Sequence, residues 1–60
     1  MFIVTVSHNN ETWPLRGTNW AYSMERAQHF ETRTDAKLQL DKAKKFMAPK
    51  LYRDAIIVEI

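Results

Sequence analysis

The sequence contains no cysteine, and its 60 residues include only one glycine and two prolines. Without cysteine there is no disulfide framework and no thiolate metal site, and the composition fits a reducing compartment. No apolar run approaches the ~18 residues of a membrane span, and the first residues lack the basic leader of a secretory signal. We therefore expect a cytoplasmic protein that does not enter a membrane. The single glycine, Gly17, predicts a turn position with positive φ.

The small size of the chain limits both its organisation and its stability. Sixty residues predict a single domain, residues 1–60. A domain this short buries only roughly 60% of the surface that its unfolded chain exposes, so we expect marginal stability, and association with a second copy is one remedy. Both ends fall in predicted strands, which leads us to expect a complete small protein. The formal net charge of +2 does not by itself indicate a nucleic-acid partner.

The longest segment with helical periodicity covers residues 32–47. Its apolar stripe, at spacings of four, three and four, consists of Ala36, Leu40, Ala43 and Met47. Thr32 followed by Asp35 matches a helix-capping pattern, and Thr34 is an alternative cap. Pro49 predicts the end of the helix, because a residue that precedes proline is pushed out of the α region.

The most apolar segments, residues 2–6 and 55–60, predict strands because they are rich in β-branched and aromatic residues. In the second segment, Ile56, Val58 and Ile60 share one face. We expect these two strands to pair at the centre of the sheet. The predicted fold class is α+β: a small antiparallel or mixed sheet of three to four short strands, covered on one face by the long helix, plus a short helical turn.

The middle of the chain is less regular. Asn9–Asn10 predicts a hairpin turn into a return strand at residues 12–15. Pro14 has no N–H for a ladder, so that strand is expected at an edge of the sheet. Ser23 is placed to cap a short helical turn. Residues 50–54, which follow the helix, are expected to form a loop.

Large aromatic side chains are concentrated in this irregular region, and such residues dominate interface hot spots. We expect Trp20 to lie in the core and Trp13 to be partly exposed, with the edge beside Pro14 as the docking surface. Leu38 lies opposite the apolar stripe of the helix, where it is either a harmless exposed residue or an anchor for a partner or a second copy. The predicted partner-binding residues are Trp13, Arg16, Trp20, Tyr22 and Leu38.

A basic helix face offers an alternative, nucleic-acid-binding reading. The residues concerned are Arg33, Lys37, Lys44, Lys45, Lys50 and Arg53. Together with Tyr52 they could contact phosphates and stack a base. Asp41 lies inside this group and weakens it, and lysines on a helix most often form an ordinary solvated face. A self-associating structural protein, such as a homodimer, is a third hypothesis.

The sequence does not predict catalysis. His8 and His29 are far apart and have no partner at the spacing of metal ligands, so neither a metal site nor a cofactor is expected. Ser7 and His8 with Glu11 resemble a nucleophile, base and orienting acid, but adjacent residues of a strand point to opposite faces. A chain this small also has little room for a pocket of ~300 Å³. We therefore expect a protein that is not an enzyme.

A motif of packing and capping residues runs through the middle of the chain as Trp20-x6-Ala27-x2-Phe30-x-Thr32-x3-Ala36. This pattern resembles many small, mostly uncharacterised phage and prophage proteins, in which a short opening hairpin leads to a tryptophan, an Ala-x-x-Phe-x-Thr element and a helix. The resemblance spans about half of the chain. It implies a phage accessory protein in the cytoplasm of a bacterial host, which binds and inhibits a host enzyme or defence complex without catalysis.

Overall fold

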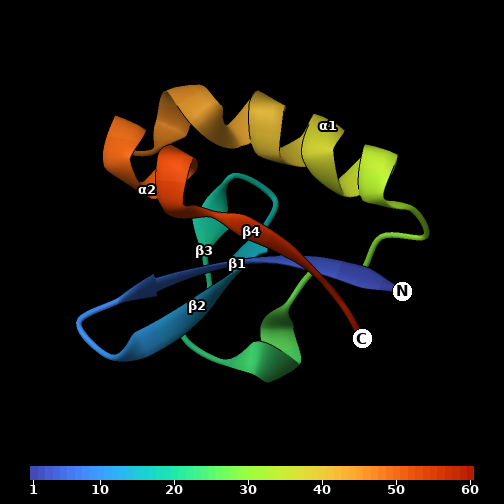
Figure 1. Cartoon of the computed structure of the whole chain (residues 1–60), viewed down its shortest axis with the longest axis horizontal. Helices are drawn as coiled ribbons and strands as arrows, with labels where there is room; N and C mark the ends of the chain where they lie inside the picture. The colour runs from blue at the N-terminus through green and yellow to red at the C-terminus, as the bar shows by residue number, and fades with distance from the viewer.

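The computed structural model describes residues 1–60 as a four-stranded antiparallel sheet with a long helix packed across one face (Figure 1). The strands are β1 (Phe2–His8), β2 (Glu11–Arg16), β3 (Asn19–Trp20) and β4 (Ile56–Glu59), in the order β3-β2-β1-β4. The helical elements are η1 (Met24–Arg26), α1 (Arg33–Ala43), η2 (Lys44–Phe46) and α2 (Pro49–Asp54). The predicted α+β class is thus confirmed. No helix has the length and apolar character needed to cross a membrane.

Helix α1 begins where the capping pattern predicts. The Thr32 hydroxyl accepts a hydrogen bond from the Asp35 N–H at 3.0 Å, so Thr32 is the cap and Thr34 is not. The first three residues of the predicted stripe are buried, and Met47 packs half-buried against the core. The predicted helix is continuous to Ala43 and then tightens into the 3-10 turn η2.

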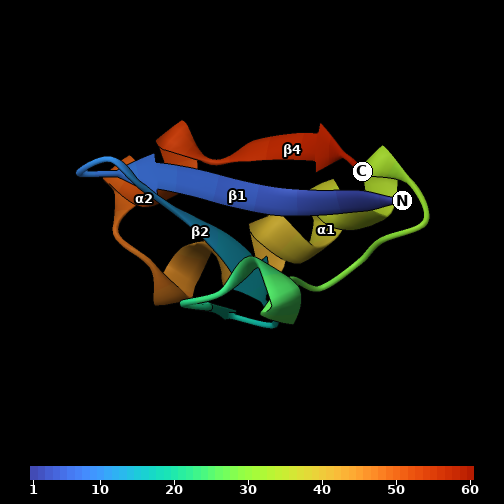
Figure 2. The same ribbon diagram turned by 90° about the horizontal axis from the view of Figure 1, so that it is seen from below.

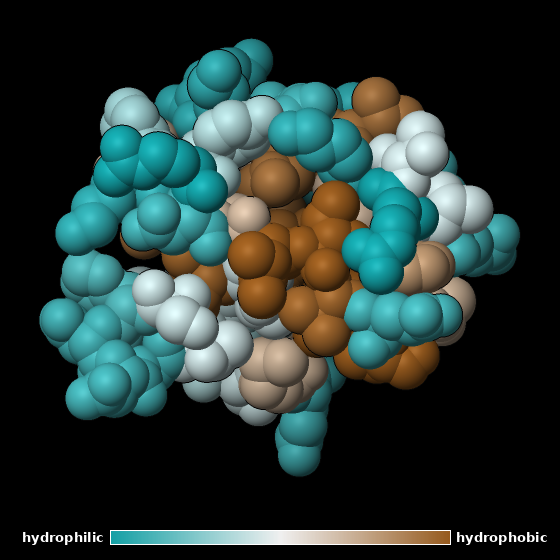
Figure 3. Space-filling view, viewed as in Figure 1, coloured by the Kyte–Doolittle hydropathy of each residue, from teal (hydrophilic) through white to brown (hydrophobic).

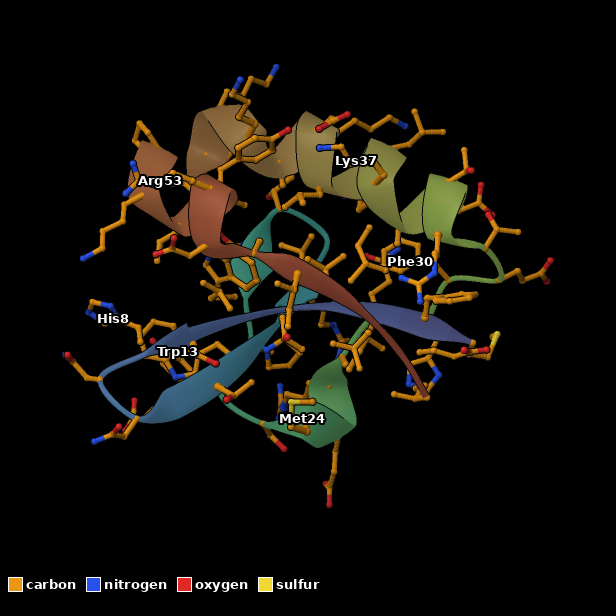
Figure 4. The ribbon with its side chains drawn as sticks, in the orientation of Figure 1. His8, Trp13, Met24, Phe30, Lys37 and Arg53 are labelled. Atoms are coloured by element: carbon orange, nitrogen blue, oxygen red, sulfur yellow. The ribbon has the colours of Figure 1, made fainter.

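A single core lies between α1 and the sheet. Its buried members are Val4, Leu15, Phe30, Ala36, Leu40 and Ala43. Phe30 and Phe2 exchange both backbone hydrogen bonds at 2.8 Å, so Phe30 continues the sheet beside β1. Figure 4 shows Phe30 between α1 and β1. The residues just before α1 therefore connect the helix directly to the central strand.

The opposite face of the sheet is covered only in part. Element η1 lies on this side, away from α1, and packs against β2 (Figures 1 and 2). Thr5 of β1 stands opposite both Pro14 of β2 and Ile56 of β4. Thr5, Pro14 and Ile3 are buried here, whereas Ile56 is 57% exposed. The second face therefore leaves β4 uncovered.

The predicted strand positions need one correction. The proline-bearing strand β2 is an interior strand, and β4, which was expected at the centre, is an edge strand that pairs only with β1. Pro14 is tolerated because β3 contains only two residues and ends before it faces Pro14. The Pro14 carbonyl still accepts a hydrogen bond from the Ala21 N–H at 2.8 Å. Pro14 therefore lacks its backbone N–H at a position beyond the last residue of β3.

The predicted loop at residues 50–54 was also wrong. These residues belong to the helix α2, which begins at Pro49. Proline ends the preceding helix, but its fixed φ and missing N–H suit the first position of a new one. Leu51 and Tyr52 on this short helix are half-buried, and Tyr52 packs against the core.

The turns follow their predicted chemistry. Asn9 and Asn10 have φ values of 51° and 67°, the positive pair that a two-residue hairpin turn requires. Gly17 has φ +63°, as its turn position predicts. The Ser23 hydroxyl accepts a hydrogen bond from the Glu25 N–H at 3.3 Å and caps η1. Local sequence signals therefore determine all three connections in the first half of the chain.

Candidate binding surface

A cleft of about 610 Å³ lies along the β3 edge of the sheet, so the expectation that so small a chain has little room for a pocket was wrong. It is lined by Arg16, Asn19, Trp20, Ala21, Tyr22 and Arg26. Three of the predicted partner-binding residues, Arg16, Trp20 and Tyr22, thus meet in one place. The lining combines two guanidinium groups, one carboxamide and two aromatic rings, which suits a planar or anionic group held by both charge and stacking. We call this site the β3 cleft.

The turn that carries the β3 cleft is held from both sides. The Gly17 N–H donates to the Gln28 side-chain oxygen at 2.9 Å, and the Gln39 side-chain nitrogen donates to the Gly17 carbonyl at 2.8 Å. Gln28 also donates its backbone N–H to the Leu15 carbonyl at 3.1 Å. The segment after η1 and helix α1 therefore fix the position of Arg16, which directly precedes the glycine. A site fixed in this way loses little conformational entropy on binding.

The aromatic wall of the cleft continues along the hairpin. Trp20 is half-buried: it packs against the core and also lines the cleft, and its indole N–H is buried with no hydrogen-bond partner. Tyr22 is 93% exposed and lies edge-on to Trp13, with ring centroids 6.5 Å apart. His8 follows at 6.2 Å from Trp13 (Figure 4). The expected half-buried position of Trp13 is confirmed, and Trp20 is less buried than a core residue.

The charges of the β3 cleft are not neutralised within the molecule. The two ion pairs of the protein, Lys37–Asp41 and Arg53–Asp54, involve neither Arg16 nor Arg26. No carboxylate lines the cleft, although Glu25 lies in an adjoining hollow with both arginines. The cleft is therefore cationic, and an incoming carboxylate or phosphate would find two guanidinium groups free of internal ion pairs.

The predicted partner-binding residues and the lining of the β3 cleft overlap only in part: Trp13 and Leu38 do not line the cleft, and Asn19, Ala21 and Arg26 line it without having been predicted. Leu38 lies on α1, is 55% exposed and lines no part of the cleft. Arg26 lines the cleft but was not predicted from the sequence. Only the packing of η1 against β2 brings Arg26 to the cleft. No local signal marks that packing, since a single arginine in a 3-10 turn is an ordinary surface residue.

The predicted basic helix face is largely occupied by contacts within the protein. The Tyr52 hydroxyl accepts a hydrogen bond from the Lys37 ammonium at 2.9 Å and donates one to Asp41 at 2.6 Å. Lys37 and Lys44 stand 5.0 and 4.9 Å from the centre of the Tyr52 ring. The hydrogen bonds with Tyr52 and Asp41 raise the pKa of Lys37, and those with Tyr52 and Lys37 lower the pKa of Asp41.

The other members of this basic set are also engaged. Arg33 stands 5.0 Å from the centre of the Phe2 ring, and Lys45 stands 5.3 Å from that of its neighbour Phe46. Arg53 lies 3.8 Å from Asp54. The remaining lysine, Lys50, takes part in no ion pair or cation–π contact. Lys44 and Lys45 line a second hollow, of about 540 Å³, together with Lys42 and Asp41. None of the predicted nucleic-acid-binding residues lines the β3 cleft.

The groups considered for catalysis or metal binding do not converge. The Ser7 hydroxyl lies 3.2 Å from the Thr12 hydroxyl, its cross-strand neighbour, while His8 points to the other face and contacts Trp13. His29 is exposed in the segment before α1. No three histidine, cysteine, aspartate or glutamate side chains gather where they could hold a metal ion.

The fold and the β3 cleft together define a small α+β protein with a cationic, aromatic surface at one end of its sheet. No protein-family model matches the chain, and neither a curated protein nor a solved structure shows significant similarity to it. The chemistry of the β3 cleft is therefore the basis for assigning a function to the protein.

Proposed function

We propose that the protein is a non-catalytic binding protein that takes an acidic segment of another protein into the β3 cleft. The observation that carries this proposal is the pairing of Arg16 and Arg26, both free of internal ion pairs, with the rings of Trp20 and Tyr22 in one cleft. Arginine and aromatic residues are enriched at interface hot spots.

The geometry of the cleft favours a peptide carboxylate as the ligand. Each guanidinium can hold a carboxylate by two parallel hydrogen bonds, and the exposed Tyr22 ring can cover an apolar neighbour in the bound segment. Acidic side chains would then supply long-range attraction, and the aromatic wall would supply contact area.

The phage resemblance suggests a setting for this activity. In that setting the acidic segment would belong to a bacterial enzyme or defence complex, and occupation of its surface by this protein would inhibit it. Catalytic groups are not required for such a role. Nucleic-acid binding through α1 and α2 is the competing function, and the engagement of Lys37 and Lys44 with Tyr52 argues against it.

Tryptophan fluorescence can test the proposal, because Trp20 lines the cleft. In a Trp13→Phe background, we expect the emission to change on addition of poly-glutamate but not of poly-lysine, with a midpoint that rises steeply with salt. Arg16→Glu with Arg26→Glu should abolish the response. Lys42→Glu with Lys45→Glu is the matched control, since it makes the same change in net charge on α1 and η2, away from the cleft.

The two double variants also separate the competing functions. If a single-stranded oligonucleotide binds and the control variant loses that binding while the arginine variant keeps it, the basic helix face is the functional surface and the proposal is wrong. The same conclusion follows if poly-glutamate binds both double variants as tightly as it binds the parent chain.

A further inference from the structure

Strand β4 presents an open row of backbone hydrogen-bonding groups. The Ile60 N–H donates to the Met1 carbonyl at 2.8 Å, so the even-numbered residues at this end of the chain direct their backbone groups toward β1. Backbone groups of successive residues in an antiparallel ladder point to alternate sides. The N–H and C=O of Ile57 and Glu59 therefore point away from the sheet, where no strand lies beside them.

The side chains along this edge are apolar and uncovered. Ile56 and Ile60 are 57% and 58% exposed, and Val58 between them is half-buried. All three project to the face opposite α1, since they stand across from Thr5, Met1 and Ile3. Figure 3 shows a hydrophobic patch in the middle of the face where β4 crosses the view in Figure 1.

The other edge of the sheet does not share this feature. β3 is only two residues long. Natural sheets protect their edges with short strands, lysine, proline, bulges or inward-pointing charges. β4 has four residues, twice as many as β3, and contains no lysine or proline. Its one charged residue is Glu59, at the end of the strand.

We propose that β4 pairs antiparallel with β4 of a second copy, around a two-fold axis that passes through Val58. In this register Ile57 and Glu59 of one copy exchange backbone hydrogen bonds with Glu59 and Ile57 of the other. Val58 then faces its own counterpart, and each Ile56 faces the partner's Ile60, so all the exposed aliphatic side chains of the strand become cross-strand neighbours.

Charge selects this register over the next one along. A shift of the partner by two residues toward the end of the strand would place Glu59 directly opposite the partner's Glu59, and like charges in that position are destabilising. In the proposed register each Glu59 lies one residue position from the axis, so the two carboxylates are two positions apart, and each stands opposite the partner's Ile57. The sequence Ile-Ile-Val-Glu-Ile is thus complementary to itself at one register.

The size of the contact sets its expected strength. A standard interface buries about 800 Å² of each partner, which is about a fifth of the 4290 Å² that one copy exposes. One added strand with its flanking isoleucines is smaller than that. We therefore expect a dimer that forms in the micromolar range and dissociates on dilution.

The absence of cysteine provides a direct test. In Val58→Cys the two introduced thiols would face each other across a non-hydrogen-bonded pair, with Cα atoms about 4.5 Å apart, within the range of a disulfide. We expect oxidation to convert most of this variant into covalent dimer. Ile56→Cys alone should form no covalent dimer on oxidation, because its two thiols lie roughly 13 Å apart along the strands. A mixture of Ile56→Cys and Ile60→Cys chains should cross-link.

A second pair of variants tests the same register without cysteine. Ile56→Lys with Ile60→Lys places like charges opposite each other and should abolish dimerisation in sedimentation equilibrium. Ile56→Lys with Ile60→Glu places opposite charges together and should restore it. A parent chain that sediments as a monomer at millimolar concentration would overturn the proposal. The open edge of β4 would then be available only to a strand of another protein. Equal cross-linking of Ile56→Cys and Val58→Cys would overturn the register.

Discussion

The Tyr52 hydroxyl shows how a single side chain determines what a charged surface can do. It lies between Lys37 and Asp41, and its ring has a second lysine, Lys44, above it. From the sequence, these lysines belong to a basic face that is available to phosphates. In the structure they have partners already, because α2 brings Tyr52 back against α1. The helical spacing predicts which residues share a face but not which residue of a later helix contacts them.

This arrangement predicts a measurable change in the ionisation of Asp41. The hydrogen bond from Tyr52 is the largest cause that lowers the pKa of Asp41 from its ordinary value of 3.8. Tyr52→Phe should therefore move this pKa back toward 3.8, as followed by NMR titration of the carboxyl carbon. Tyr22→Phe is the control, because Tyr22 forms no hydrogen bond with Asp41, and it should leave the titration unchanged.

The lowered pKa also fixes the direction of the pH dependence. Because the folded-state pKa of Asp41 lies below 3.8, the carboxylate contributes its stabilising interaction above that pH, and the contribution is lost as the pH falls through the folded-state value. The difference in melting temperature between the parent chain and Asp41→Asn should therefore be present at neutral pH and vanish in strong acid. A difference that grows on acidification would contradict the proposed hydrogen bonds.

At the scale of elements, the features that the sequence predicts correctly are those whose signals are local. The Thr32 cap, the alternation in β4 and the two asparagines of the hairpin each act within a few residues. The errors arose where the outcome depends on distant segments. The interior position of β2 depends on β3 stopping before Pro14, and helix α2 depends on proline starting a helix as well as ending one.

The residues that line the β3 cleft divide in the same way. Trp20 and Tyr22 could be named from the sequence because aromatic residues in an irregular region attract attention. Arg26 could not, since only the path of η1 behind the sheet brings it beside Arg16. Leu38 was predicted as a partner-binding residue because it lies opposite the apolar stripe of the helix. That pattern predicts its exposure on α1. The pattern does not predict that the β3 cleft lies elsewhere.

The helix cap gives a prediction at this scale. Thr32→Ala removes the acceptor for the Asp35 N–H and should lower the free energy of unfolding by about 1 kcal/mol, measured by urea denaturation. Thr32→Ser keeps the hydroxyl and should restore most of the loss. Thr34→Ala should have little effect, and a comparable loss there would mean that the helix begins two residues later in solution.

For the whole molecule, stability depends on very few residues. Only six buried side chains form the core between α1 and the sheet, and there is no disulfide. A single core in a chain of this size rarely supplies more than about 3–5 kcal/mol. A single large core deletion should therefore remove most of the folding free energy, whereas a surface deletion of the same size should not.

Leu15 and Leu38 form a matched pair for this test. Leu15 is completely buried and Leu38 is 55% exposed. Leu15→Ala should cost about 3 kcal/mol and leave only about 0–2 kcal/mol of the folding free energy, so that the urea midpoint followed by circular dichroism falls close to zero denaturant. Leu38→Ala should remain within about 0.5 kcal/mol of the parent chain. Equal losses would show that Leu38 is buried in solution, for example against another molecule.

The order β3-β2-β1-β4 places the cleft and the open strand at opposite margins of the sheet. A dimer joined at β4 would therefore keep both clefts free, at the two ends of one continuous sheet and roughly 35 Å apart at the usual strand spacing. Such a particle acts as a bivalent clamp: once one acidic segment is held, a second on the same target meets the other cleft at high effective concentration. Targets that repeat their acidic segments, as symmetric assemblies do, would be retained far longer than single chains.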